Sequence, residues 1–241
     1  MSLSYLISVL WRAPMIALST AVMGSISIIT ALWDSNGNTQ LKVARAWAWT
    51  LLKLGGVKVK VVGGERIDPS QSYVIVSNHV SYMDTPALLY HLKLNFRFMA
   101  KRGLFEVPFI GGHLRQAGHI SVPLEDPRAA LKVLSHAGQE LKQRGHSVLV
   151  FPEGGRSASG ELQEFKDGAA YLAIKGGVPL LPVCLIGMRE VLPMHSVHLR
   201  PGEVTLRIGE PIDVSGMKSS DREALTERLK SEIRAMQQLG R

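Results

Sequence analysis

YVIVSNHVSYMDTPALL, residues 73–89, is the segment around which the chain is organised. It opens with an apolar, mostly β-branched run, as in a buried strand, and the polar turn Ser77–His79 follows. The segment after the turn reads as a helix that starts near Asp84 and Pro86, because proline is favoured at or near the first helical position. A strand, a turn and a helix in this order are typical of open α/β sheets, which present chemistry at their carboxyl edge.

His79 and Asp84 are five positions apart in this stretch. On one continuous helix they would lie about 140° apart, at about 100° per residue, and would not face each other. If His79 is still in the turn and Asp84 is in the first helical turn, the carboxylate reaches the imidazole. The pair is then a general base with the group that orients it. The alternative is that His79 caps the turn and Asp84 caps the helix.

The bulk composition indicates one α/β domain that meets a membrane and anionic ligands. The chain has 241 residues, a net charge of +8 and 46% hydrophobic residues. A basic balance would also suit nucleic acid, but no helix-turn-helix, zinc-finger or aromatic-stacking motif is present, so we expect no nucleic-acid partner. The single cysteine, Cys184, lies in the apolar run Leu180–Ile186 and is expected to be a buried residue in a reducing compartment.

The N-terminal region predicts membrane-embedded helices. Ala13–Trp33 contains no charged residue and is about long enough to cross a hydrocarbon core, either as a transmembrane helix or as half of a hairpin in one leaflet. Basic residues after it, Lys42, Arg45 and Lys53, favour a catalytic domain on the cytoplasmic side. Leu41–Leu54 reads as an amphipathic helix with two tryptophans, lying either at the bilayer interface or against the domain.

The rest of the chain alternates strands and helices, which predicts an α/β fold: a single mixed-sheet domain flanked by helices. We therefore assign residues 1–56 to membrane-anchoring helices and 57–241 to the αβ domain. Strands are expected at 57–62, 73–76, 96–100, 119–122, 147–151, 180–186 and 204–208, and helices at 84–91, 126–145, 165–175 and 221–239.

Some local details of these elements are also predicted. In the 126–145 helix, Leu131, Leu134 and Leu141 are expected to point inward. In the last helix, Ser220 and Glu223 form the pattern of a capping box. The inward stripe of that helix is expected to be Leu225, Leu229, Ile233 and Met236.

Phe151–Ser157, FPEGGRS, is a second candidate for chemistry, because a buried strand runs straight into it. Gly154 lets a substrate approach the backbone, and Arg156 offers a planar fork to phosphate or carboxylate. Glu153 is the acidic group beside them. The alternative is a tight turn with a surface arginine. Gly155–Ser159 lacks the second glycine of G-x-S-x-G, so a serine-hydrolase elbow is not supported.

Further segments carry weaker signals. Lys101 and Arg102 follow a strand, where Lys101 either binds a phosphate or is simply solvated. The prolines of Val178–Val183, VPLLPV, predict a strand at an edge or at a bulge, which either lines a hydrophobic groove or is structural. His195 and His198 have no companions at ligand spacing, so they are expected at the surface and no metal site is predicted.

Three of these segments together resemble the glycerolipid acyltransferases, a family that acylates lysophospholipids such as 1-acyl-sn-glycerol-3-phosphate. N78-H79-V80-S81-Y82-M83-D84 resembles its N-H-x-x-x-x-D block, FPEGGRS its F-P-E-G-T-R-S block and VPLLPV its V-P-x-x-P-V block. The blocks occur in the family's order over about residues 57–209. The resemblance implies an αβ domain tied to the membrane by N-terminal helices.

The resemblance also implies roles for individual residues. His79 is the general base, oriented by Asp84, and Lys101 and Arg156 bind the acceptor phosphate. Glu153 and Gly154 contact the substrate. One block departs: Gly118–Leu124 places leucine where the family's G-x-I-F-I-D-R block has a phosphate-binding arginine, and Arg128 is the nearest arginine in the sequence after it.

The leading hypothesis is therefore a membrane-bound O-acyltransferase that makes phosphatidic acid from lysophosphatidic acid. Its acyl donor would be acyl-CoA or acyl-carrier protein, with no cofactor and no metal, and its partners would be membrane lipids. The alternatives are the same chemistry on another lysophospholipid or on a lyso-aminolipid, a lipid hydrolase that activates water, and a catalytically silent lipid-binding module.

Overall fold

The structure is a computed structural model that describes residues 2–240, apart from the side chains of residues 142–144. Its sheet has seven strands in the order β1-β7-β6-β2-β5-β3-β4 within the described residues. Neighbouring strands are parallel except β6 and β7, so the sheet is mixed, as predicted. The strands are β1 Val57–Val62, β2 Val74–Ser77, β3 Phe96–Lys101, β4 Ile120–Val122, β5 Ser147–Val150, β6 Leu180–Ile186 and β7 Gly202–Ile208.

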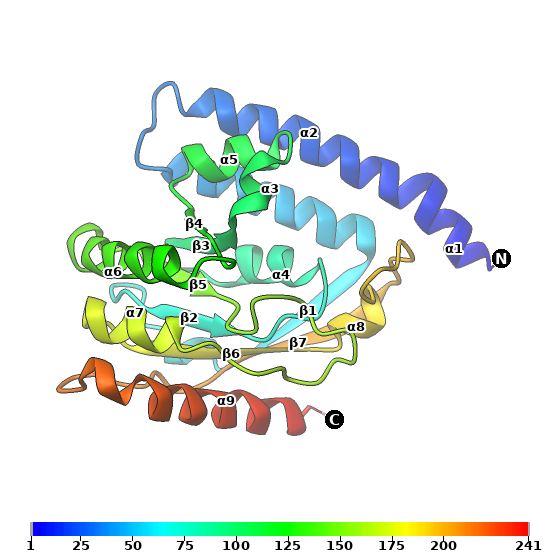
Figure 1. Cartoon of the computed structure of the whole chain (residues 1–241). Coiled ribbons are helices and arrows are strands. Elements are labelled where there is room, and N and C mark those ends of the chain that lie inside the picture. The colour runs from blue at the N-terminus through cyan, green and yellow to red at the C-terminus, as the bar shows by residue number, and fades with distance from the viewer. Residues whose placement is uncertain (1, 241) are drawn as a thin grey trace.

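Helices cover both faces of this sheet (Figure 1). One apolar core lies between the sheet and α3 and α4, and the other lies between the sheet and α6, α7 and α9. The helices are α1 Leu3–Ile7, α2 Ala13–Thr30, α3 Asn38–Gly55, α4 Asp84–His91, α5 Ile110–Gln116, α6 Pro127–Arg144, α7 Gly168–Gly176, α8 Met188–Val191 and α9 Arg222–Gln238. This architecture confirms the predicted α/β class.

The boundaries of α6 follow from its sequence, but one of its predicted core residues is wrong. Asp126 caps the helix by accepting from two backbone N–H groups, and Gly145 ends it in the left-handed conformation at φ 64°. Leu134 and Leu141 are buried, whereas Leu131 is 50% exposed. Leu131 lies about 60° from Leu134 around the helix axis, at the flank of the buried face.

The start of α9 also differs from the prediction. The capping box is formed by Lys218 and Asp221, with the Lys218 N–H donating to Asp221 Oδ2 at 2.7 Å, and not by Ser220 and Glu223. The reason is that a 3₁₀ turn at Ser219–Asp221 precedes the helix and takes the cap. The predicted inward stripe from Leu225 to Met236 is buried. Likewise α7 begins at Gly168, three residues later than expected.

β6 is a central strand, so the prediction that its prolines place it at an edge or bulge is wrong. The Pro182 carbonyl accepts from the Gly209 N–H at 2.8 Å. The nitrogen and carbonyl of one strand residue point the same way, so the missing N–H of Pro182 faces Gly209, just beyond the end of β7. The proline therefore removes no bond from the ladder with β7. Cys184 of the same strand is buried, as predicted, and burial raises the pKa of its thiol to about 12.

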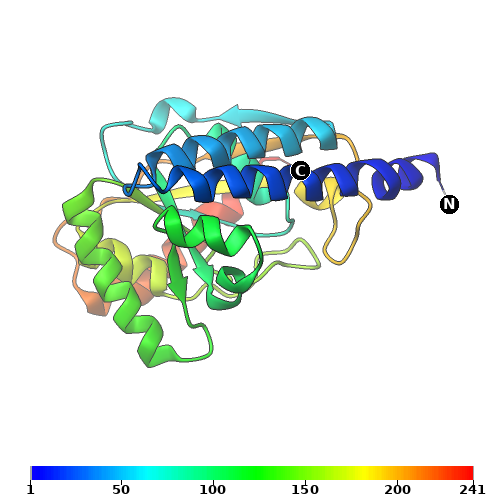
Figure 2. The ribbon, with the colours of Figure 1, turned by 90° about the horizontal axis from the view of Figure 1, so that it is seen from above.

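The N-terminal helical segment lies along the domain, side by side with α3 (Figure 2). The Trp47 indole donates to Thr20 Oγ1 at 3.0 Å, and Arg12 donates to the Leu199 carbonyl at 2.8 Å. α3 packs one apolar face on the sheet, which is the packed alternative considered for Leu41–Leu54, while Trp49 stays 46% exposed. The N-terminal helical segment is thus attached to the domain by these contacts.

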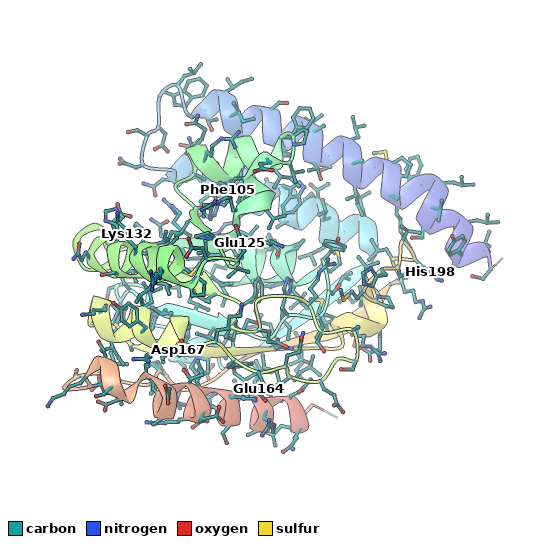
Figure 3. All side chains as sticks on the ribbon, in the orientation of Figure 1. Phe105, Glu125, Lys132, Glu164, Asp167 and His198 are labelled. Carbon is teal, nitrogen blue, oxygen red and sulfur yellow. The ribbon has the colours of Figure 1, made fainter. Side chains whose placement is uncertain are left out.

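The loop before β7 also holds this N-terminal segment. Ser8 donates to the Val197 carbonyl at 2.7 Å and accepts from the Leu199 N–H at 2.8 Å. His198, which is labelled in Figure 3, is half-buried. Its Nε2 lies 3.0 Å from Ser4 Oγ, and its ring is edge-on to Tyr5. His198 thus lies at the surface, partly covered by α1.

Candidate active site

Two loops leave adjacent strands at one edge of the sheet and form the candidate active site. β2 ends at Ser77 and β5 at Val150, and the register pairs Val76 with Val150. The turn that carries His79 and the loop that begins at Phe151 therefore start side by side. Asn78 anchors the first of these by a reciprocal pair of hydrogen bonds with the Leu185 backbone on β6, at 2.8 and 2.9 Å.

The imidazole of His79 contacts the carboxylate of Asp84, as the turn-then-helix interpretation predicts. His79 Nδ1 lies 2.8 Å from Asp84 Oδ2, and α4 begins at Asp84. The same oxygen accepts the backbone N–H groups of Val80 at 2.7 Å and Ser81 at 2.8 Å. The Asp84 side chain is fully buried. Three donors converge on one oxygen, so the carboxylate is held as an acceptor and Nδ1 carries the proton.

The other nitrogen of His79 is therefore the basic one. The ring stacks on Phe151 with centroids 3.9 Å apart and planes 13° apart, which fixes its orientation. The side chain remains 18% exposed. A neutral imidazole that is fixed at Nδ1 and reachable from outside presents Nε2 as a proton acceptor.

Glu153 joins the two loops. Its Oε1 accepts the His79 backbone N–H at 2.8 Å, and its Oε2 accepts the Gln163 N–H at 2.9 Å. The Ser157 N–H donates to the His79 carbonyl at 2.8 Å, which closes the same junction. Glu153 is buried, and burial raises the pKa of its carboxyl group, although both backbone bonds act against that rise. Both of its oxygens are engaged with backbone, so the carboxylate sets the position of His79.

Gly154 lies beside Glu153 in the left-handed conformation at φ 73°. A Cβ at this position would come within 3.2 Å of Cε and Nζ of Lys166, whose side chain crosses the glycine. Glycine therefore fits this position for two reasons: it adopts the left-handed backbone conformation, and it leaves space for the side chain of Lys166. Gly155 differs: a Cβ there would meet nothing within 4 Å.

Arg156 is held by an aromatic ring. Its guanidinium carbon lies 3.5 Å from the centroid of the Tyr82 ring. Nη1 is buried and has no hydrogen-bond partner within the described part of the chain. Tyr82 itself is 62% exposed, which is high for a large aromatic side chain. The guanidinium is thus positioned by its face, while no acceptor within the described residues engages its edge.

Lys101 stands apart from these residues. It is the last residue of β3, it is exposed, and β3 is separated from β2 by β5. Among the described residues its ammonium forms no ion pair or hydrogen bond with the His79 loop. The structure thus brings His79, Asp84 and Glu153 into direct contact and places Gly154 and Arg156 on the adjoining loop, while Lys101 lies at the same edge of the sheet.

Three residues near the site had no role in the sequence interpretation. Phe151 supports the His79 ring, Tyr82 supports Arg156, and Lys166 crosses Gly154. Tyr82 and Phe151 lie inside quoted motifs, where an aromatic residue next to a charged one is the available signal. Lys166 gives no such signal, because its placement depends on how the loop after Gly155 returns to the Pro152 carbonyl, which accepts the Lys166 N–H at 2.9 Å.

An apolar cavity of about 120 Å³ lies next to the start of α4. α2, α3, α4, α5 and β3 contribute its walls, including Thr85, the neighbour of Asp84. Phe98 lines the cavity and stacks on Phe151, with ring centroids 6.5 Å apart. His113, also in the wall, lies 2.6 Å from Ser27 Oγ, and burial lowers its pKa to about 4. This wall is therefore uncharged near neutral pH.

The position expected to hold a phosphate-binding arginine carries no such group. Leu124 follows β4 and is half-buried, and Arg128 is exposed in the first turn of α6. Among residues 2–240, no group of three or more histidine, cysteine or acidic side chains is placed to hold a metal ion.

Comparison with known proteins gives one consistent result. The model of the acyltransferase family matches residues 58–186, more than half of the chain. A 1-acyl-sn-glycerol-3-phosphate acyltransferase of Chlamydomonas reinhardtii is 37% identical over 151 residues, covering 62% of this chain and 45% of its own length. The human 1-acyl-sn-glycerol-3-phosphate acyltransferase alpha is 30% identical over 190 residues, covering 79% of this chain and 67% of its own length.

The fold is similar to that of a solved structure. The 1-acyl-sn-glycerophosphate acyltransferase PlsC of Thermotoga maritima superposes with a TM-score of 0.80 at 26% identity, covering 97% of this chain and 96% of the other. This likeness extends over the N-terminal helices as well as the sheet. The chain spans about half the length of the algal and plant relatives that it matches.

Proposed function

The chain belongs to the acyltransferase family, and from that premise we propose that it is a membrane-bound O-acyltransferase that makes phosphatidic acid from lysophosphatidic acid. The acyl chain would move from an acyl thioester to the free hydroxyl of 1-acyl-sn-glycerol-3-phosphate. The observation that carries this proposal is the 2.8 Å contact between His79 Nδ1 and Asp84 Oδ2 at the carboxyl edge of the sheet.

The chemistry assigned to His79 follows from its surroundings. A lysolipid hydroxyl is a poor nucleophile near neutral pH and needs a base as it attacks. Nε2 of His79 takes that proton, and the carboxylate of Asp84 stabilises the imidazolium that results. The proton then passes to the departing thiolate. Neither an acyl-enzyme intermediate nor a metal is required by this route.

Recognition of the acceptor is assigned to two cations, the half-buried Arg156 and the exposed Lys101. The phosphate of lysophosphatidic acid would meet the guanidinium of Arg156, with Lys101 as a second cation at the same sheet edge. A planar guanidinium with unpaired N–H groups suits a phosphate monoester. Glu153 and Gly154 contribute by shaping the loop that carries Arg156.

The N-terminal helices are proposed to seat the domain on the membrane. α1 and α2 are joined by a π-helical turn at Ser8–Arg12 into one continuous helix, Leu3–Thr30. This helix is apolar and long enough to cross a bilayer, and only 11% of its most apolar 18 residues are buried. Because its other side is bonded to the domain, we place this helix in the surface layer of the bilayer, with the domain on the cytoplasmic side. The outward side chains that would enter lipid are Leu3, Leu10, Trp11, Leu18, Val22, Ile26 and Ile29.

The donor is proposed to be acyl-CoA or acyl-carrier protein. Part of the acyl chain would occupy the apolar cavity that begins at Thr85, one residue after Asp84. Its apolar walls suit a hydrocarbon chain. No cofactor enters the proposed reaction.

Leu124 favours a second candidate with the same chemistry. It stands where the family's arginine binds the acceptor phosphate, so another lysophospholipid or a lyso-aminolipid is the alternative acceptor. Hydrolysis of the thioester by water is the less favoured outcome, because the sequence offers no serine elbow.

The test is product identification by mass spectrometry after purified protein in detergent is incubated with an acyl thioester and one acceptor at a time. We expect phosphatidic acid from lysophosphatidic acid, and little product from lysophosphatidylcholine or a lyso-aminolipid. Product only from another acceptor would overturn the assigned substrate and keep the acyl transfer. Free fatty acid without any acylated acceptor would contradict acyl transfer itself.

A further inference from the structure

Tyr82 is the most exposed aromatic side chain near the active-site turn, and it has a specific neighbour. It lies between His79 and Asp84 in the sequence, yet 62% of it is exposed while Val80, Ser81 and Met83 around it are buried. A large ring that is left outside a well-packed turn forgoes the free energy of burial. The guanidinium of Arg156 covers one face of the ring at 3.5 Å.

Arg156 has little else to fix it. Within the described residues no side chain or carbonyl accepts a hydrogen bond from its guanidinium, and Nη1 is buried without a partner. An arginine normally loses much rotamer freedom when it is ordered, so a single stacking contact has to select its orientation. Stacking uses the face of the guanidinium. The N–H groups along its edge lie in one plane and can donate hydrogen bonds to an anionic ligand that binds there.

We propose that Tyr82 is a positioning residue for the acceptor phosphate: it holds the guanidinium plane of Arg156 so that the fork is ordered before the lysolipid binds. This proposal rests on the proposed function, in which Arg156 binds that phosphate. It adds a residue that does not touch the phosphate and acts through Arg156.

The absence of an arginine at position 124 raises the importance of this arrangement. With Leu124 in that place, Arg156 is the guanidinium that the loops of the site offer to the phosphate. Lys166 crosses Gly154 nearby, but an ammonium on a flexible stem provides a point charge and not a planar fork. Preordering of Arg156 therefore determines how strongly a phosphate monoester is preferred over an acceptor without one.

The experiment compares Tyr82→Leu with Tyr82→Phe and with Tyr90→Leu. Tyr90 lies on α4, is 37% exposed and contacts His91 edge-on, so Tyr90→Leu makes the same chemical change away from Arg156. We expect Tyr82→Leu to raise the KM for lysophosphatidic acid about fivefold, the scale of one exposed cation–π contact, with kcat changed less than twofold. Tyr82→Phe keeps the ring face and is expected to restore the parental KM.

A second acceptor distinguishes positioning from a general effect. With monoacylglycerol, which has no phosphate, Tyr82→Leu and the parent are expected to have the same KM. An equal loss with both acceptors would overturn the proposal, because it would assign Tyr82 to membrane contact or to the shape of the whole turn. Equal KM values for Tyr82→Leu and Tyr90→Leu with lysophosphatidic acid would also overturn it.

Binding without turnover separates this proposal from the proposed function. Lysophosphatidic acid is added to each protein in detergent, and the rise in Tm that ligand binding causes is measured. A smaller rise in Tyr82→Leu than in Tyr90→Leu supports the proposal even if the parent fails to turn the lipid over, in which case the proposed function fails alone. Equal rises in the two variants would overturn the proposal.

Discussion

Asp84 and Arg156 lie in neighbouring loops of one site, and the protein holds them in opposite ways. Asp84 is fully buried, and one of its oxygens accepts three hydrogen bonds from the turn that it completes. Arg156 stacks on an exposed ring and leaves its donors unused. The fold itself therefore fixes Asp84 and, through it, the proposed base His79, whereas Arg156, the proposed phosphate-binding group, has no hydrogen-bond acceptor within the described residues. Chemistry and acceptor recognition should separate cleanly in kinetics.

The largest expected effect comes from the base. His79→Ala removes the proton acceptor, and we expect kcat for lysophosphatidic acid to fall a hundredfold or more, the usual scale for a general base. Thiol release from the acyl thioester measures it. His195→Ala is the matched control, because His195 is exposed in the loop before β7. An unchanged kcat in His79→Ala would show that the hydrogen-bonded turn of His79 and Asp84 has a structural role and no catalytic one.

Asp84→Asn tests whether His79 needs the negative charge of Asp84 or only the hydrogen bonds that Asp84 accepts. The amide oxygen can replace Oδ2 and still accept from His79, Val80 and Ser81, while the amide nitrogen replaces Oδ1, which is buried without a partner. We expect kcat to fall about ten- to a hundredfold, because the imidazolium loses its counter-charge. An unpaired buried amide costs about 1–3 kcal/mol, so the Tm is expected to fall as well. Parental kcat with a lower Tm would make Asp84 a purely structural cap.

Arg156→Ala should show the opposite pattern. The side chain forms no hydrogen bond with the described protein, so the Tm is expected to stay within a degree or two of the parent. The KM for lysophosphatidic acid should rise about tenfold, since a charge-assisted contact to phosphate is lost, and kcat should change little. Arg156→Lys, which keeps the charge without the fork, serves as the intermediate variant. A large fall in Tm with an unchanged KM would show that Arg156, like Asp84, is part of the hydrogen-bonded structure and does not bind the acceptor.

The smallest effect concerns Glu153, which connects the two regions. Burial raises the pKa of its carboxyl group above the ordinary 4.5, so ionisation is harder in the folded than in the unfolded chain. Its contribution to stability is therefore fully present below about pH 4.5 and is lost as the pH rises through the higher folded pKa. We expect the Tm of the parent to fall by a few degrees relative to Glu153→Gln as the pH rises from 4 to 7. A constant difference would contradict this.

The contact between His79 and Asp84 was predictable from the sequence because the two residues are close in the chain. Five positions, a turn and a helix start were enough to bring His79 to Asp84. The contacts of Glu153 with the backbone N–H groups of His79 and Gln163 were not predictable, because they depend on how two distant loops meet. The same holds for the stacking of Arg156 on Tyr82, which joins the two loops through a surface contact.

Most elements of the fold were also predictable, and the errors have physical causes. Pro182 was expected at an edge because a proline usually interrupts a ladder, but here it faces Gly209, just beyond the end of β7. Leu131 lies about 60° around the helix axis from the buried Leu134, so it falls at the flank of the buried face and is exposed. The packing of α2 against α3 and α5 could not be predicted from hydropathy, because hydropathy reports how apolar a helix is and not which elements pack against it.

The most direct test is a parallel determination of kcat and of the KM for lysophosphatidic acid in the parent, His79→Ala and Arg156→Ala, in one detergent and with one acyl thioester. We expect His79→Ala to lose kcat a hundredfold or more at a near-parental KM, and Arg156→Ala to keep kcat and raise KM about tenfold. Retained kcat in His79→Ala, or loss of the same parameter in both variants, would contradict a preset base with separate acceptor recognition.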